Sequence, residues 1–271
     1  MKGENFKKWA LITGGSSGIG LEMARSLSKR GFHIVLTARG KERLEKAAIE
    51  MITTNGVEVK TLSIDLAQPD APEKIYNFCK NENCSISVLV NNAGYAISSA
   101  FDKTPMEEEE KFIRVLGIAV IALTKLFLSD MLQTGEGKIA IVSSVAAFAP
   151  PSAIQPLYGP IKTFVNRFSE GINKNYNSKG ITSTAVCPGY TITNFHTASG
   201  VQNEMDRVPA FMKKSAQRVA EEAVKAILKG KKVCVPTTTY KLIVFLLRTL
   251  PHALFPLFSR RLAPGRYNQD R

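Results

Sequence analysis

Cysteine and histidine are scarce in this sequence, and neither forms a recognisable metal-binding or disulfide pattern. The chain of 271 residues has four cysteines and three histidines. The cysteines, at positions 79, 84, 187 and 234, form no Cys-x-x-Cys pair, and no histidine stands at metal-ligand spacing. The sequence therefore predicts no metal site and no disulfide framework, and it favours a reducing, cytoplasmic compartment.

A long apolar run is missing from the N-terminal segment. After Lys7 and Lys8 only Trp9–Ile12 is apolar before the chain reaches a glycine-rich turn. This run is too short for the hydrophobic region of a secretory signal, so we expect no cleaved signal peptide.

Acidic residues are scarce in the last quarter of the chain. The net charge is +13, and between Arg207 and Arg271 there are fourteen Lys and Arg residues but three acids, so +11 of the charge lies there. No nucleic-acid recognition motif accompanies this charge, so we expect no nucleic-acid partner. An anionic membrane surface is the favoured partner.

The sequence does contain an alternation of short apolar runs with amphipathic stretches of helix length. The expected strands are Trp9–Thr13, His33–Ala38, Glu58–Ser63, Ser87–Asn91, Gly137–Ser143, Thr182–Cys187 and Lys232–Val235. The expected helices are near Gly18–Arg30, Lys41–Thr53, Pro72–Asn81, Glu107–Leu132, Leu157–Tyr176 and Ala216–Lys229. This order predicts an α/β fold, a single doubly wound Rossmann domain with a seven-stranded parallel sheet. We place that domain at residues 1–237 and treat residues 238–271 as an apolar and basic extension, not as a second domain.

A glycine-rich turn follows the first expected strand. From Thr13 to Gly20 the sequence is Thr-Gly-Gly-Ser-Ser-Gly-Ile-Gly, and a helix is expected from Gly18. Gly14 permits a tight turn, and the first N–H groups of the helix can face a pyrophosphate. The turn therefore predicts a dinucleotide site.

Arg39, after the second expected strand, indicates which dinucleotide binds. A NAD-specific site usually carries an acid at this point, where this chain has Thr37-Ala38-Arg39-Gly40-Lys41. The guanidinium can pair with a 2′-phosphate, and no carboxylate stands beside it to repel that phosphate. The sequence favours NADPH over NADH, with a solvated arginine at a strand end as the alternative.

Tyr158 and Lys162 form the second chemical feature. Their spacing of four puts both side chains on one helix face, where the ammonium is expected to lower the pKa of the tyrosine hydroxyl. Such a tyrosine can deliver a proton to a carbonyl oxygen. Pro160 lies between them, and it is tolerable only if the helix begins at or just before Tyr158, because an interior proline costs ~3 kcal/mol.

With these motifs in place, residues 8–236 resemble the short-chain dehydrogenase/reductase family, in particular its NADP-dependent ketone, steroid and 3-ketoacyl reductases. The glycine turn, Asp65, Asn91–Gly94, the Tyr-x-x-x-Lys pair and Pro188-Gly189 follow one another in the family's order. The resemblance implies that Tyr158 is the catalytic acid, that Lys162 lowers its pKa and binds the ribose, and that Ser144 donates to the carbonyl oxygen. It implies cofactor contacts from Gly14, Ser16, Ser17, Gly18, Ile19, Gly20, Arg39, Asp65, Leu66, Asn92, Ala93, Gly94, Tyr158, Lys162, Pro188, Gly189, Thr191 and Thr193.

Two departures from the family pattern bear on catalysis. Ser144 precedes Tyr158 by 14 residues, one more than the family spacing, so Ser143 remains the alternative donor, and a hydroxyl that merely caps the strand end remains a third interpretation. Leu116 stands where the family places an asparagine that anchors a water of the proton relay, and leucine can neither donate nor accept a hydrogen bond. We expect a working but altered relay.

Apolar residues after the sixth expected strand favour an apolar substrate. Those expected to line the pocket are Phe195, Val201, Met205, Val208, Phe211 and Met212, joined by Tyr95 and Phe148. The leading hypothesis is an oxidoreductase that transfers a hydride between NADP(H) and a lipid- or steroid-like ketone or alcohol. The alternative is a nucleotide-binding sensor or scaffold protein without catalysis.

The extension has two interpretations. Residues 239–261 are apolar and basic, but an arginine, two prolines and a histidine between positions 248 and 256 argue against a membrane-spanning helix, which needs ~20 mainly apolar residues. Either a short helix lies in a membrane interface, or Leu242–Leu250 packs on the protein. The family resemblance also implies a homodimer or homotetramer built around the long fourth and fifth helices.

Overall fold

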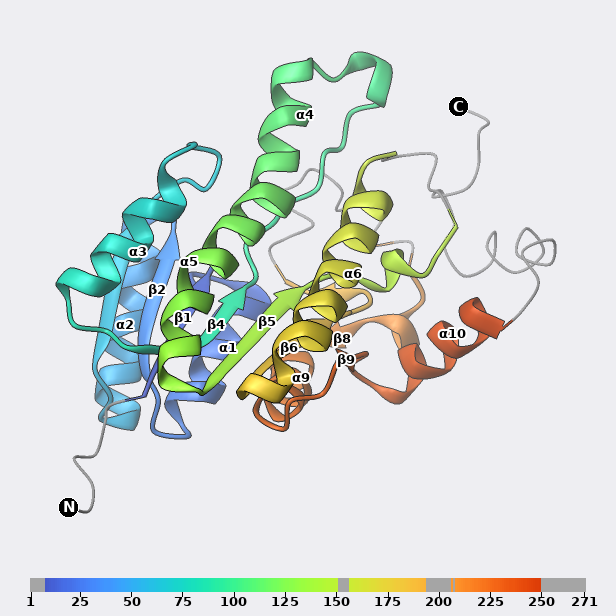
Figure 1. The fold of residues 1–271 in the computed structure, drawn as a ribbon. Helices are drawn as coiled ribbons and strands as arrows, with labels where there is room; N and C mark the ends of the chain where they lie inside the picture. Colours follow the sequence, from blue (N-terminus) through green and yellow to red (C-terminus); the bar gives the residue numbers. More distant parts are fainter. Residues whose placement is uncertain (1–7, 151–155, 194–205, 207, 250–271) are drawn as a thin grey trace.

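The structure of the protein is a computed structural model that describes residues 8–150, 156–193, 206 and 208–249. Its main sheet has seven parallel strands in the order β3-β2-β1-β4-β5-β6-β9 (Figure 1). These strands are β1 (Trp9–Thr13), β2 (His33–Ala38), β3 (Val59–Ser63), β4 (Ile86–Asn91), β5 (Gly137–Val142), β6 (Ile181–Val186) and β9 (Val233–Cys234). Because the strand order reverses between β1 and β4, the predicted doubly wound sheet is confirmed.

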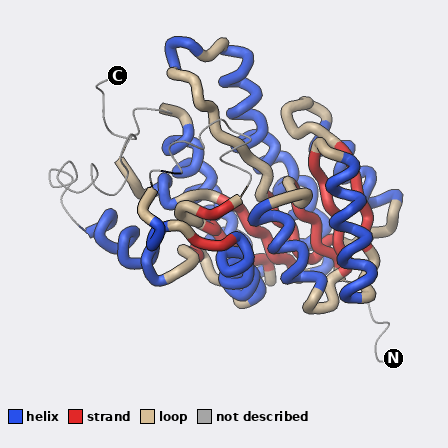
Figure 2. Tube along the Cα trace, turned by 180° about the vertical axis from the view of Figure 1, so that it is seen from behind, coloured by secondary structure: helices blue, strands red, loops and turns tan. Residues whose placement is uncertain are grey.

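Helices cover both faces of the sheet (Figures 1 and 2). One face carries α1 (Gly18–Ser28), α2 (Lys41–Asn55) and α9 (Ala216–Leu228), and the other carries α3 (Ala71–Asn81), α4 (Met106–Ile113), α5 (Ala119–Thr134) and α6 (Tyr158–Tyr176). In β1, Trp9 and Leu11 belong to one core and Ala10 and Ile12 to the other, and all four are buried. Burial on both sides explains why the strands are apolar runs without polar alternation.

Two helices end later than the sequence predicts, and a glycine sets the end each time. α2 continues to Asn55 and α5 to Thr134, two residues beyond the expected ends. Gly56 and Gly135 follow them with φ of +65° and +69°. A glycine in this left-handed conformation terminates a helix without steric cost, so the chain stops there.

The predicted fourth helix is interrupted. Instead of one continuous helix, α4 and α5 are joined by a π-helical segment, η2 (Arg114–Ile118). Within the described ranges, the run Met106–Thr134 alone has the length and hydropathy of a membrane-spanning helix, but 56% of its most apolar window is buried inside the protein. It therefore packs as a core helix of the α/β domain.

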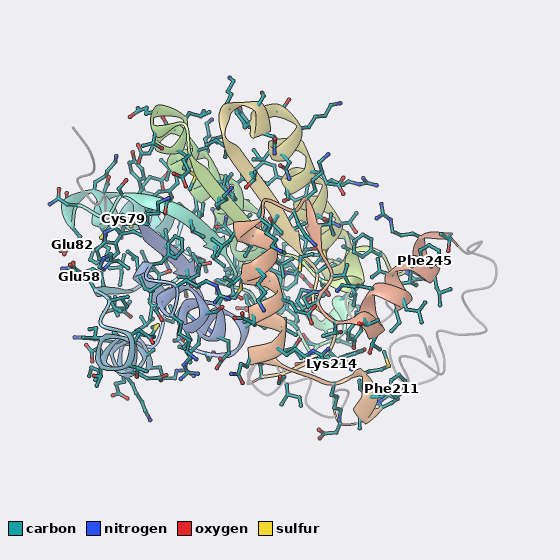
Figure 3. The ribbon with its side chains drawn as sticks, turned by 90° about the horizontal axis from the view of Figure 1, so that it is seen from below. Glu58, Cys79, Glu82, Phe211, Lys214 and Phe245 are labelled. Carbon is teal, nitrogen blue, oxygen red and sulfur yellow. The ribbon has the colours of Figure 1, made fainter. Side chains whose placement is uncertain are left out.

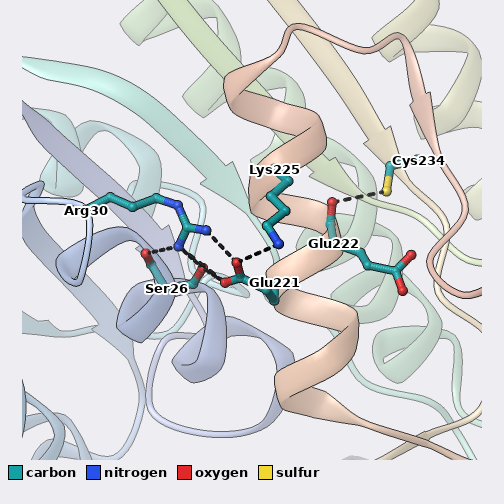
Figure 4. A network of polar contacts seen from close by, with 6 residues as sticks. All are labelled: Ser26, Arg30, Glu221, Glu222, Lys225 and Cys234. Carbon is teal, nitrogen blue, oxygen red and sulfur yellow. Dashed lines mark hydrogen bonds and ion pairs between the residues drawn. The ribbon is translucent and has the colours of Figure 1, made fainter.

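A polar network joins α1 to α9 on the outside of the sheet (Figure 4). The Glu221 carboxylate of α9 accepts from Ser26 Oγ of α1 at 2.7 Å. It also forms ion pairs with Arg30, two residues beyond the end of α1, and with Lys225 of α9. These partners, Arg30 above all, lower the pKa of Glu221 to about 2. The network links the first helix of the fold to its last sheet-covering helix.

Beyond the main sheet, the chain forms small elements beside the β9 edge. A two-stranded sheet pairs β7 (Thr191–Ile192) with β8 (Lys214–Ser215), and the extension contributes α10 (Thr238–Thr249) (Figure 1). The 3-10 turns are η1 (Phe101–Lys103), η3 (Val145–Ala147), η4 (Asn177–Lys179) and η5 (Ala210–Met212). β7, η3, η5 and α10 gather near the carboxyl ends of β5 and β6, where the candidate site lies.

Candidate active site

The glycine-rich turn between β1 and α1 packs against the residues that follow β4. Gly14 and Gly18 have φ of +65° and +57°, a conformation that side chains disfavour. A Cβ at Gly14 would stand 2.9 Å from both Ala93 Cα and Asn92 Nδ2, too close for a side chain. Asn92 Nδ2 also donates to the backbone oxygen of Thr13 at 2.9 Å. Two predicted cofactor segments are thus brought into direct contact.

Among the described residues, neither a side-chain cap nor an acid occupies the N-terminus of α1. Its N-cap, Ser17, makes no side-chain capping hydrogen bond, and no acid lies in the first turn of this fully described helix. The first N–H groups are therefore available to a pyrophosphate. A Cβ at Gly18 would stand 3.2 Å from Thr193, so the turn also meets the segment after Pro188-Gly189. This glycine cradle fits a dinucleotide.

Two arginines follow β2, the predicted Arg39 and a second one, Arg43. Arg39 is exposed, and its backbone oxygen accepts from Ser63 Oγ at 2.9 Å. Arg43, in the first turn of α2, folds back so that its Nε would lie 3.2 Å from a Cβ at Gly40. In the sequence, Arg43 could have been found from its position about one helical turn after Gly40. Both guanidinium groups follow β2, so each is a candidate to bind a 2′-phosphate.

The residues after β3 form a tight turn, in which the Asp65 carboxylate already accepts one backbone hydrogen bond. Asp65 Oδ1 accepts from the backbone N–H of Ala67 at 2.9 Å, and Leu66 is buried. The second carboxylate oxygen of Asp65 and the neighbouring backbone remain candidates for the adenine contact that the family resemblance implied.

Tyr158 and Lys162 stand on the first turns of α6, which begins at Tyr158. The condition that Pro160 set on the helix start is therefore met. Lys162 is only 6% exposed, its Nζ donates to the backbone oxygen of Val142 at 2.9 Å, and this Nζ lies 5.7 Å from the centre of the Tyr158 ring. Burial lowers the pKa of Lys162 to about 8. The two side chains can therefore act as a coupled acid and cation.

Ser144 and Ser143 have different tasks. Ser143 is buried, and its hydroxyl donates to the backbone oxygen of Lys162 at 2.8 Å. Ser144 caps η3 by accepting from the Ala146 N–H at 3.1 Å. Because a hydroxyl both donates and accepts, this cap leaves the Ser144 proton available to a carbonyl oxygen. The geometry therefore supports Ser144 over Ser143 as the donor to the carbonyl oxygen. Ser144 also caps η3, but that role uses only its oxygen as an acceptor.

Leu116 lies in the π-helical segment and is buried, and both its side chain and the Lys162 amine approach Gly94. A Cβ at Gly94 would stand 3.7 Å from Leu116 Cγ and 3.9 Å from Lys162 Nζ. The family resemblance implies an asparagine at this position, and the leucine side chain offers the lysine no hydrogen bond. π-Helical turns are rare and occur frequently at functional sites.

A small, mainly apolar hollow adjoins Tyr158, with a cavity volume of about 10 Å³, which is room for about one water. Its lining consists of Ile97, Ser99, Phe101, Glu109, Phe112, Pro156, Leu157 and Tyr158. Tyr95, one of the expected lining residues, packs edge-on against Phe112 with ring centres 5.5 Å apart. The walls on this side thus come from the segment after β4, from α4 and from the start of α6.

The other expected lining residues are placed differently. Val208 and Met212 are buried against Tyr240 of α10, so they pack the protein interior. Phe211 is exposed, and Phe148 lies under the guanidinium of Arg248 at 5.6 Å. The remaining three, Phe195, Val201 and Met205, lie outside the described residues.

Hydrogen bonds to the backbone hold the segment after β6 in place. Val145 N donates to the backbone oxygen of Pro188 at 3.0 Å, which joins this segment to the loop of Ser144. Thr191 is buried, and its hydroxyl donates to the backbone oxygen of Gly189 at 2.9 Å. Serine loop, Pro-Gly segment and glycine turn therefore form one continuous wall.

Comparison with known proteins agrees with this geometry. A family model described as short chain dehydrogenase matches residues 8–204. A very-long-chain 3-oxoacyl-CoA reductase of Anas platyrhynchos is 35% identical over 73% of this chain and 64% of its own length, and a 17-beta-hydroxysteroid dehydrogenase type 3 of Danio rerio is 37% identical over 67% and 60%. The chain thus spans less than two thirds of these two relatives.

Solved structures show the same architecture. A short-chain dehydrogenase from Sphingobium yanoikuyae in complex with NADPH superposes with a TM-score of 0.80 and 28% identity, covering 96% of this chain and all of its own. This agreement extends over the sheet and the helices on both of its faces.

Proposed function

The chain belongs to the short-chain dehydrogenase family, and we propose that it is an NADPH-dependent reductase of an apolar carbonyl compound, able to oxidise the corresponding alcohol in reverse. The observation that carries the proposal is the convergence of two motifs at one sheet edge. The glycine turn follows β1, while Ser144 follows β5 and Lys162 Nζ binds the last residue of β5. β4 lies between β1 and β5 in the sheet, so cofactor and acid meet at the carboxyl ends of three neighbouring strands.

The residues at this edge are suited to hold the cofactor along its whole length. The N-terminus of α1 would bind the pyrophosphate, and Arg39 with Arg43 would bind the 2′-phosphate. Asp65 and the Asn92–Gly94 segment would contact the adenosine half, and Lys162 a ribose. The nicotinamide half would lie against Pro188–Thr193. NADPH in the Sphingobium yanoikuyae relative supports this choice over NADH.

The chemistry divides between the cofactor and three side chains. Bound NADPH supplies the hydride for the carbonyl carbon. Ser144 donates a hydrogen bond to the carbonyl oxygen, and Tyr158 transfers its proton there, so the carbonyl becomes a hydroxyl and the tyrosine a phenolate. The Lys162 ammonium stabilises the phenolate until the proton is restored from solvent. Oxidation of the alcohol runs the same transfers backwards.

The substrate we propose is a lipid-like ketone, either a 3-oxoacyl thioester or a ketosteroid. The hollow beside Tyr158 is small, but its lining is mainly apolar, and apolar walls next to the acid favour an apolar ligand. The relatives named for 3-oxoacyl-CoA and for 17-beta-hydroxysteroids support this class.

The test is turnover of NADPH against a panel of 3-oxoacyl-CoA esters, ketosteroids and polar ketones. The wild type should consume NADPH with an apolar ketone, and Tyr158→Phe should remove that activity while it retains NADPH binding. Tyr176→Phe, on the far end of α6, is the matched control and should be active. Tight NADPH binding without turnover on any member would instead support the alternative, a non-catalytic NADP(H) sensor or scaffold, which the apolar Leu116 favours.

We also propose that α10 contacts an anionic membrane surface from the cytoplasmic side. Its inner face is packed, since Tyr240 and Val244 are buried, whereas Leu242, Phe245 and Leu246 are exposed. Phe245, 62% exposed, and Phe211 of η5 both stand at the periphery on the α10 side, with Lys214 nearby (Figure 3). An apolar helix face within a segment of net charge +11 is typical of an interfacial helix.

Flotation with vesicles of phosphatidylserine and phosphatidylcholine tests this contact. The variant Leu242→Glu/Phe245→Glu should lose vesicle binding and keep its fold, because both side chains point away from the protein. Ile49→Glu/Ile52→Glu, at exposed positions of α2, is the matched control and should float like the wild type. Equal flotation of all three proteins would refute the membrane contact.

We further propose a homo-oligomer formed through η2 and α6. Ile118 and Phe164 are 46% and 49% exposed, and the ring of Phe164 reaches a Cβ position at Gly117, so they form one apolar surface across two helices. Sedimentation should give a dimer or tetramer for the wild type and a smaller species for Ile118→Glu/Phe164→Glu. A monomeric wild type would contradict this proposal.

A further inference from the structure

Tyr240 of the extension is built into the wall of the candidate active site. It is 1% exposed, and its hydroxyl makes two hydrogen bonds to backbone atoms of other segments. The Tyr190 N–H donates to it at 2.9 Å, and the hydroxyl donates to the backbone oxygen of Met212 at 2.9 Å. One side chain thus joins the segment after β6 to η5.

The ring of Tyr240 fills the space that a side chain at position 189 would need. A Cβ at Gly189 would overlap the Cζ and Cε atoms of that ring. Gly189 does not have a positive φ, so its glycine is required by the closeness of Tyr240 and not by backbone conformation. The Pro-Gly motif and the extension are therefore complementary in shape.

α10 is anchored so that this contact is held in place. Glu222 of α9 accepts from the backbone N–H of Thr237 at 2.9 Å and pairs with Lys241 at 3.5 Å, on either side of the first turn of α10. Burial raises the pKa of Tyr240, so the hydroxyl keeps its proton and its donor role throughout the working pH range. The contacts of Glu222 thus hold the first turn of α10, the helix that carries Tyr240.

The segment that Tyr240 holds lies between two parts of the candidate site. Thr193 meets the glycine turn at Gly18, and Pro188 accepts from the residue that follows Ser144. We propose that Tyr240 is a positioning residue, which fixes the Gly189–Thr193 backbone where it meets the nicotinamide half of the cofactor. The inference rests on the proposed function, and it makes the first turn of the extension part of the catalytic unit.

The first test separates the two halves of the cofactor. Tyr240→Phe keeps the ring but leaves the Tyr190 N–H and the Met212 oxygen without their partner, which should loosen the nicotinamide wall and lower kcat and NADPH affinity by about fivefold or more. Affinity for 2′,5′-ADP, a probe of the adenosine half, should change less than twofold. The matched control Tyr76→Phe removes a hydroxyl bond to Asp130 at 3.0 Å, far from the site, and should leave all three values unchanged.

The outcomes distinguish this inference from the proposed function. A folded Tyr240→Phe with wild-type kcat and NADPH affinity overturns the positioning role, and so does an equal loss of 2′,5′-ADP and NADPH affinity, which would indicate general destabilisation. A wild type that binds no NADPH overturns the proposed function itself.

A second test uses the shape complementarity. Gly189→Ala should abolish most NADPH binding in the wild-type background, because its Cβ collides with the ring of Tyr240. In the Tyr240→Ala background the same change should cost at least fivefold less, since the space is vacant. Strictly additive losses would contradict the contact as the cause.

Discussion

Lys162 Nζ donates to the backbone oxygen of Val142 at 2.9 Å and stands 5.7 Å from the centre of the Tyr158 ring. The end of β5 therefore holds the Lys162 amine close to the Tyr158 ring. Because the side chain is buried, the pKa of Lys162 falls from 10.5 to about 8. The amine is charged at neutral pH and loses its charge only slightly above it, which sets the pH range in which it can stabilise a phenolate.

The rate of carbonyl reduction should accordingly decline as the pH rises through about 8, the pKa of Lys162. The protonated amine is the active form, so kcat/KM should be level below that pH and fall above it. Lys162→Arg keeps its charge at higher pH, and although its overall rate should be lower, its decline should shift upward. An identical decline in the wild type and Lys162→Arg would assign the titration to another group.

Leu116→Asn tests whether the missing asparagine limits the proton relay. The amide would lie beside Lys162 and could hold a water there, so the turnover rate should rise or the pH profile shift, by well under the ~100-fold that a directly acting acid contributes. Burying the amide should cost ~1–3 kcal/mol of stability. Leu116→Val, which is apolar like the wild type, is the control. Unchanged kinetics in both variants would mean that this position does not matter for the relay.

The sequence predicted the main sheet closely, because its strands are buried on both faces and are therefore continuous apolar runs. β1 and β2 have the expected bounds, and the order reverses where the glycine turn lies. The motifs around Gly14 and Tyr158 were equally accessible, since their chemistry requires particular residues at short spacing. Such local requirements can be recognised without knowledge of the fold.

Features that depend on contacts between distant segments could not be predicted in the same way. The π-helical turn at Leu116 has no distinctive local composition, and the packing of Tyr240 on Gly189 joins residues far apart in the chain. Val208 and Met212 were expected to line the pocket, but α10 covers them. Apolar side chains at helical spacing look the same whether they face a substrate or a neighbouring helix.

Arg39→Ala and Arg43→Ala test the choice of NADPH over NADH. Each loses one charge-assisted hydrogen bond to the 2′-phosphate, a loss of about 1.5–3 kcal/mol, which corresponds to a rise of roughly ten- to a hundredfold in KM for NADPH. KM for NADH, which has no such phosphate, should change little. Lys46→Ala, an exposed cation further along α2, is the control. An equal effect on both cofactors would show that these arginines act on the fold and not on the phosphate.

Glu221→Gln should destabilise the protein at neutral pH but not in acid. The pKa of Glu221 is lowered from 4.5 to about 2 in the folded protein, so its ionised form contributes stability above about 4.5, and this contribution is lost as the pH falls toward 2. The carboxylate side chain is 39% exposed, so we expect a loss of only about 1 kcal/mol in the free energy of unfolding. Urea unfolding at neutral pH and near pH ~3 should show this difference shrinking with acid, in the window that linkage assigns to the group. Glu110→Gln, an exposed carboxylate of α4, should show a smaller difference at both values. A constant difference across the pH range would mean that the Arg30 and Ser26 contacts stabilise the neutral amide as well as they stabilise the carboxylate.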